Sequence, residues 1–153
     1  MDEKEIKQKC LKLMETADAA YLSTISDDGF PHTRMMGNLR NEQQCKIAKE
    51  LFSDHDEDFM IYMLTGGSSP KMKQIRANPK VSVYFANAAE LHTLLLVGDI
   101  KEIDDPDLKK KMWQDEWKMH WPGGAEDPEF TLLQLVPTYA KGWYKDTPFE
   151  FKL

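Results

Sequence analysis

The chain has 153 residues, enough for one domain with a single core, and its 41% hydrophobic and 30% charged residues are typical of a soluble globular protein. Its net charge of −6 argues against a nucleic-acid partner, which needs a basic surface, but allows a local basic pocket. The longest apolar run, 59–64, is too short to span a membrane, and no apolar signal segment opens the chain. Cys10 and Cys45 form neither a disulfide framework nor a metal motif, so we expect a cytoplasmic protein with a single domain over 1–153.

The first forty residues predict a helix followed by a hairpin. Apolar residues recur at helical spacing over 3–16, and the predicted face consists of Ile6, Cys10, Leu13, Met14 and Ala17. The β-prone segment 20–26 ends in Asp27-Asp28-Gly29, a strong turn signal. We therefore expect 30–39 to return as the second strand of a hairpin.

The middle of the chain is polar at first and regular afterwards. Within 41–58 a short helix is expected around 47–52, and the acidic end of that segment is expected to be a solvated loop. The apolar run 59–64 predicts a buried strand. Ser69 suits the N-cap of the next helix, and Pro70 suits its first position, where a missing N–H costs nothing. Asn78-Pro79 is expected to end that helix.

The second half predicts strands at 81–86 and 91–103, then a helix that opens at 104–106 and runs to Trp121. Its aromatic face would consist of Trp113, Trp117, His120 and Trp121, most simply as core or dimer packing. Segments 130–136 and 139–144 are the last expected strands. About seven strands in hairpin order, with helices inserted singly, predict a mainly β antiparallel barrel with peripheral helices rather than a parallel sheet.

The usual catalytic motifs are absent from the sequence. No GxGxxG, Walker, GxSxG or HExxH pattern occurs, and the four histidines are scattered, so a metal site or a triad hydrolase is not expected. His32 is expected to be a surface residue of its strand.

Two local features could bind an anion. The segment 66–71 places a glycine-rich turn, a serine hydroxyl and Lys71 at the start of a helix, where backbone N–H groups favour phosphate. The alternative is a simple capped helix with a solvated lysine. Arg34 lies inside an apolar strand, where it could bind a phosphate through its fork of donors or extend to solvent at a sheet edge. The local sequence leaves both alternatives open.

Several segments, taken in order, resemble the pyridoxamine 5′-phosphate oxidase superfamily. The first half contributes Gly29-Phe30-Pro31-His32-Thr33-Arg34-Met35-Met36, Ile61-Tyr62-Met63-Leu64-Thr65, Ser69-Pro70-Lys71-Met72-Lys73-Gln74-Ile75 and Asn78-Pro79. The second half resembles the general stress protein branch through Trp121-Pro122-Gly123-Gly124, Asp127-Pro128, Leu132-Leu133-Gln134-Leu135 and Ala140-Lys141-Gly142-Trp143. The resemblance implies an antiparallel split β-barrel, a homodimer, and FMN between the two subunits.

Carried over by position, the resemblance assigns roles to nine residues. It implies that Arg34 and Lys71 hold the FMN phosphate, assisted by Ser69 and nearby amide groups. Met35, Met36, Tyr62 and Met63 would line the flavin ring through backbone groups and packing. Thr93 falls where the oxidases carry a glutamine near the polar edge of the ring. Trp143 matches an aromatic residue that covers the cofactor, from the same subunit or from its partner.

Two departures limit the expected activity. Pro70 stands where the oxidases have an arginine, and after Trp143 this sequence ends at Leu153 where the oxidases continue into a basic segment that grips the substrate phosphate. We therefore expect an FMN-dependent oxidoreductase of the general stress type whose substrate is unknown, and not an efficient pyridoxamine phosphate oxidase. A flavin-binding or sensing protein without turnover, a barrel that uses haem or a deazaflavin, and an interaction module with an empty cleft remain alternatives.

Overall fold

The computed structural model describes residues 1–153, and its regular elements follow the predicted order closely. The strands are β1 (Ala20–Ile25), β2 (Pro31–Met36), β3 (Ile61–Gly66), β4 (Lys80–Asn87), β5 (His92–Ile103), β6 (Phe130–Leu135), β7 (Tyr139–Tyr144) and β8 (Thr147–Lys152). The helices are α1 (Glu3–Thr16), α2 (Ala48–Leu51), α3 (Pro70–Ala77) and α4 (Pro106–Met112), with 3₁₀ turns η1 (Asp115–Met119) and η2 (Gly124–Glu126). The mainly β architecture with peripheral helices is confirmed.

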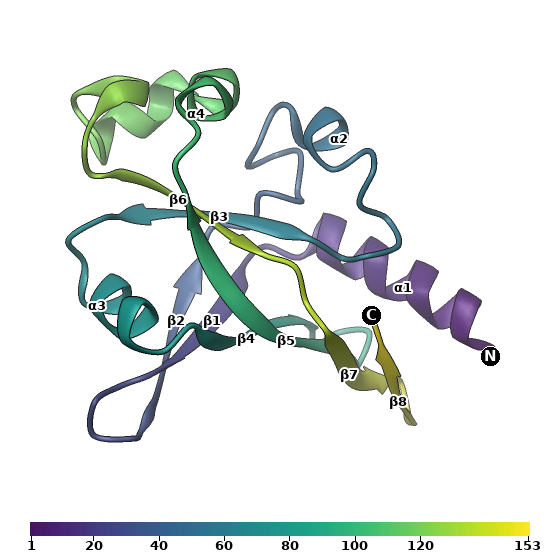
Figure 1. The fold of residues 1–153 in the computed structure, drawn as a ribbon. Helices are drawn as coiled ribbons and strands as arrows, with labels where there is room; N and C mark the ends of the chain where they lie inside the picture. The colour runs from purple at the N-terminus through teal and green to yellow at the C-terminus, as the bar shows by residue number, and fades with distance from the viewer.

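All strand pairs are antiparallel, and the sheet curls into a barrel that does not close. The strand order is β2-β1-β4-β5-β6-β3, and β7 and β8 extend from β5. The long strand β5 makes this possible, because its residues 92–99 pair with β4, and 92–97 also with β7, while its last four residues, 100–103, pair with β6 (Figure 1). Strands β2 and β3 therefore lie at the two ends of the path, and each pairs along one edge only.

The core has two parts that follow the alternation of the strands. The larger cluster fills the barrel and includes the predicted face of α1, of which Ile6, Cys10, Leu13 and Met14 are buried. The smaller cluster packs α2 and α4 against β3 and β6, which lie beneath them in Figure 1. No helix of the structure is both long and apolar enough to cross a membrane.

The predicted helix from 104 to 121 is wrong beyond Met112. Trp113 leaves the helix with φ −56° and ψ 138°, and η1 follows as a separate turn. Packing explains the break, because the three tryptophans surround one phenylalanine from β6. The ring centroids of Trp113, Trp117 and Trp121 lie 5.1, 6.1 and 4.9 Å from that of Phe130. The aromatic residues thus pack within the chain, but they do not lie on one continuous helix.

The strands differ most from the prediction at the end of β2, at the start of β3 and in an additional strand. β2 ends at Met36 rather than at 39, because the Asn38 side chain turns inward and donates to the carbonyl groups of Met14 and Ala17. β3 begins at Ile61 and not at Phe59, because Phe59 has a positive φ of 58°, which is outside the β region that a strand requires. An eighth strand, β8, was not predicted; it pairs with β7 at the edge of the sheet, where Pro148 is tolerated.

Candidate functional site

An open cleft of about 680 Å³ lies between the two ends of the strand path. β2 supplies Met35 and Met36 to its wall, and β3 supplies the segment 64–66. Lys71 enters from the start of α3, and the segment 114–121 forms the opposite wall together with Gln43 and Gln44. Because β2 and β3 each have an unpaired edge, both present free backbone groups that can bind a ligand.

Arg34 lies on the inner face of β2, beneath α3. It is directly opposite the fully buried Leu22 of β1, so its side chain follows the core-facing alternation of the strand. Its guanidinium donates to the Thr24 hydroxyl at 2.7 Å and to the Gln74 side-chain oxygen of α3 at 3.3 Å. Burial lowers the pKa of Arg34 below its usual value. The arginine is therefore held in place and does not reach out to solvent.

Lys71 is held at the other end of the same site. Its ammonium group lies 2.9 Å from the Thr65 hydroxyl of β3 and 3.4 Å from the Ser69 hydroxyl. Burial and, to a smaller extent, the positive charge of Arg34 lower the pKa of Lys71. The two cations approach the same part of α3, because Arg34 donates to Gln74, three residues after Lys71. Neither takes part in any of the ion pairs of the structure. Two partly buried cations without a carboxylate form a site that favours an anion.

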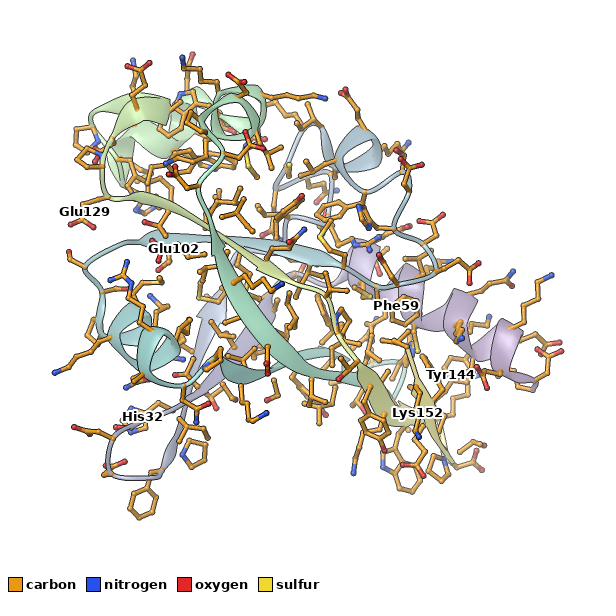
Figure 2. The ribbon with its side chains drawn as sticks, viewed as in Figure 1. His32, Phe59, Glu102, Glu129, Tyr144 and Lys152 are labelled. Carbon is orange, nitrogen blue, oxygen red and sulfur yellow. The ribbon has the colours of Figure 1, made fainter.

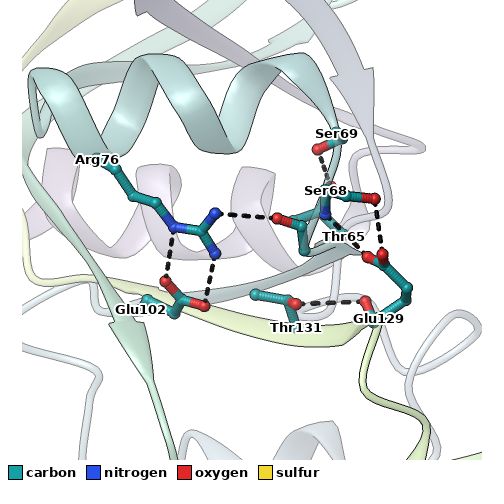
Figure 3. Close-up of polar contacts among 8 residues, drawn as sticks. Thr65, Ser68, Ser69, Arg76, Glu102, Glu129 and Thr131 are labelled. Atoms are coloured by element: carbon teal, nitrogen blue, oxygen red, sulfur yellow. Dashed lines mark hydrogen bonds and ion pairs between the residues drawn. The ribbon is translucent and has the colours of Figure 1, made fainter.

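The turn before α3 differs from the expected anion cradle. Ser69 occupies the N-cap position, but its hydroxyl does not cap the helix and lies near Thr65 and Lys71. The amide groups of the turn are already used: Gly67 N–H donates to the Glu129 carbonyl, Ser68 N–H to the Glu129 carboxylate, and Ser69 N–H to the Gly66 carbonyl. Figure 3 shows the Glu129 carboxylate against this turn. The amides of Gly67, Ser68 and Ser69 are therefore already paired within the chain, whereas the expected assistance of nearby amides to a bound phosphate stays a prediction.

The four residues predicted beside a flavin ring divide into two groups. Met35 is 69% exposed and Met36 is buried, and both line the cleft. The side chains of Tyr62 and Met63 point away from it, because Met63 belongs to the barrel core and Tyr62 packs against Phe52 with ring centroids 5.8 Å apart. Only the backbone of β3 can serve a ligand at these two positions.

Thr93 and Trp143 form a second group, away from the cleft of the same chain. They are paired across β5 and β7, and the Thr93 hydroxyl accepts the Trp143 N–H at 3.1 Å. Strands β1 and β4 separate them from β2. Trp143 is nevertheless 52% exposed, so its indole is available to a partner.

Several residues of the site were not predicted from the sequence. They are the three side chains that hold the cations, Thr24, Thr65 and Gln74, and the polar residues of the cleft wall, Gln43, Gln44, Gln114 and Glu116. One signal was available for Gln74, which lies three residues after Lys71 and therefore on the same side of α3. His32 is exposed on β2 near the hairpin turn, as expected (Figure 2).

The fold and the site together define a split barrel with an open cleft and two partly buried cations near the start of α3. The family model of pyridoxamine 5′-phosphate oxidase matches residues 6–144, and the chain belongs to this family. The resemblance seen in the sequence is thereby confirmed.

Solved structures support the same fold. A Clostridium acetobutylicum protein related to general stress protein 26 is 23% identical, with a TM-score of 0.79 over 100% of this chain and 97% of its own. General stress protein 26 of Bacillus anthracis is 26% identical, with a TM-score of 0.72 over 97% and 99%. The general stress FMN/FAD binding protein of Xanthomonas citri is 20% identical, with a TM-score of 0.70 over 98% and 96%. A search of curated proteins finds no match.

Proposed function

We propose that this chain binds FMN as a cytoplasmic homodimer and acts as a flavin-dependent oxidoreductase of the general stress type. One observation carries the proposal: Lys71 lines an open cleft, Arg34 donates to Gln74 three residues further along the same helix, and neither cation takes part in an ion pair. A terminal phosphate supplies the missing negative charge. The Xanthomonas citri structure, named an FMN/FAD binding protein, supports a flavin as the carrier of that phosphate.

The residues present fit an FMN phosphate and the edge of its ring. Arg34 of β2 offers the paired N–H donors of its guanidinium, and Lys71 of α3 offers a point charge. The Ser69 hydroxyl lies 3.4 Å from the Lys71 ammonium group and can donate to the same phosphate. Met35 and Met36 offer apolar packing for the ring, and the free edge of β3 offers backbone donors and acceptors opposite. When bound, the flavin would supply hydride or electron transfer, and the protein would supply binding and orientation.

The exposed face of the sheet supports a second copy as the partner. Tyr21, Met35, Tyr84 and Trp143 are large, exposed and on one face of neighbouring strands, according to the strand registers. Exposed apolar surface of this kind marks an interaction site. A twofold dimer built on this face would carry Thr93 and Trp143 of one subunit toward the cleft of the other.

The direct test combines the spectrum with the assembly. We expect protein reconstituted with FMN to show the near-ultraviolet and blue bands of oxidised flavin, and to sediment as a dimer when absorbance is followed at the blue band. A flavin-loaded monomer at micromolar concentration would contradict the shared site. A haem or deazaflavin spectrum in the purified protein would contradict FMN.

Steady NAD(P)H-dependent reduction of an acceptor is expected of an oxidoreductase, whereas a protein that only binds or senses flavin would show the spectrum without turnover.

Pyridoxamine phosphate is not expected to be a good substrate. It is a phosphate dianion, and its orientation over a flavin requires a second cationic clamp. Lys71 is the only lysine or arginine in the cleft lining, and Glu116 lies in the opposite wall. After Trp143 the chain forms β8, where the Glu150 carboxylate accepts a hydrogen bond from Tyr139 and no arginine occurs. We expect a steady-state assay in air to give a kcat/KM below about 10⁴ M⁻¹s⁻¹. A higher value would show that a clamp exists elsewhere.

A further inference from the structure

The turn that precedes α3 is braced from two sides, and neither brace touches the cleft. On one side, the Glu129 carboxylate accepts the Ser68 amide at 2.8 Å and the Ser68 hydroxyl at 2.6 Å, and the Glu129 carbonyl accepts the Gly67 amide at 3.0 Å. On the other side, Arg76 donates to the Gly67 carbonyl at 3.1 Å. Figure 3 shows the two braces on either side of the turn.

The two residues that hold the turn, Glu129 and Arg76, are themselves attached to the sheet. Glu129 immediately precedes β6, whose pairing with β3 sets Phe130 opposite Gly66. Arg76 makes two hydrogen bonds to the Glu102 carboxylate of β5, at 3.1 and 3.2 Å. The turn is thus tied to β5 and to the start of β6, and its position relative to β3 is set by the sheet rather than by the helix alone.

The braces bear on the anion site through Ser69 and Lys71. Ser69 directly follows the residue that Glu129 holds, and its hydroxyl points to Thr65 and Lys71 instead of capping α3. The hydrogen bonds from Ser68 lower the pKa of the Glu129 carboxyl, so Glu129 is a charged acceptor at neutral pH. Because a charged hydrogen bond depends steeply on geometry, a shift of this turn would misalign Lys71 and Ser69 toward an anion.

We infer that Glu129 is a positioning residue for phosphate recognition: it holds the 66–69 turn so that Ser69 and Lys71 face the anion that Arg34 also binds. The inference rests on the proposed binding of FMN. It assigns to an exposed glutamate, outside the cleft lining, a role in the preference of the site for FMN over riboflavin. Its negative charge acts on the turn and is not itself a contact to the ligand.

The test compares FMN and riboflavin affinities in four proteins by quenching of flavin fluorescence. Glu129→Ala is expected to weaken FMN binding about three- to tenfold, less than the loss of a charged ligand contact, while riboflavin binding stays unchanged. Glu129→Gln keeps an acceptor for Ser68 and is expected to retain most of the preference. Glu126→Ala, which removes an exposed acid three residues away that pairs with Lys110, is the matched control and should match the wild type.

The outcomes separate this inference from the proposed function. If the wild type itself binds riboflavin as well as FMN, the proposed phosphate site is wrong. If the wild type prefers FMN but Glu129→Ala keeps the same preference, only the positioning role is wrong. Tighter FMN binding in both Glu129 variants would also overturn it, since Glu129 would then act by repelling the phosphate. A preference that falls in Glu129→Ala and returns in Glu129→Gln supports it.

Discussion

Replacing Arg34 by alanine is expected to weaken FMN binding by about tenfold to a hundredfold. A hydrogen bond to a charged group contributes roughly 1.5–3 kcal/mol, and Arg34 faces the site with its guanidinium oriented by Thr24 and Gln74. The orientation matters because little side-chain freedom remains to be lost when the phosphate binds. Titration of the apoprotein with FMN, followed by flavin fluorescence, measures the effect.

Three controls isolate the phosphate from the rest of the site. Riboflavin should bind poorly to the wild type and equally poorly to Arg34→Ala, because it lacks the phosphate. Arg34→Lys keeps the charge without the fork and should recover only part of the affinity. Lys73→Ala removes an exposed cation from the same helix as Lys71 and should have no effect. Equal affinity of the wild type for riboflavin and FMN would contradict the assignment.

The strand pattern was sufficient to predict the side of β2 on which Arg34 lies, but not its neighbours. Alternation places Arg34 with Met36 and opposite Met35, and the structure agrees, because Met36 is buried and Met35 exposed. Its approach to Lys71 depends on how α3 packs across β1, which no local pattern encodes. Only the family resemblance placed the two residues in one predicted site.

The errors arose where tertiary contacts overrode local preference. The segment 104–121 has helical periodicity, yet the helix ends before Trp113 and the three tryptophans pack around Phe130 of β6. The glycine-rich turn suggested free amides, yet Glu129, distant in sequence, takes two of them. Both contacts join residues that are distant in sequence, so local sequence patterns do not predict them.

The second large effect is expected at Gly142, in the middle of β7. A Cβ atom built there would lie 2.0 Å from the Thr93 carbonyl oxygen and 2.9 Å from the Phe149 ring, so β7 could not keep its distance from β5. The Thr93 carbonyl belongs to the backbone of β5, so it cannot move aside by a rotamer change as a flexible side chain can. We expect Gly142→Ala to destabilise the protein by about 3 kcal/mol or more, which lowers the melting temperature by roughly 10 °C in a chain of this size.

The same substitution links the fold to the proposed dimer. Gly142 precedes Trp143, whose amide is held by Thr93, so a displaced β7 would move the exposed indole that we expect the partner subunit to meet. Lys73→Ala, at an exposed position of α3 and not on the sheet face that we propose as the interface, should change stability by less than about 0.5 kcal/mol and serves as the control. Calorimetry measures the melting temperatures, and sedimentation of the same samples should show Gly142→Ala dissociating at a concentration at which Lys73→Ala remains dimeric. A wild-type melting temperature in Gly142→Ala would mean that β5 and β7 are not as close at Thr93 as the structure has them.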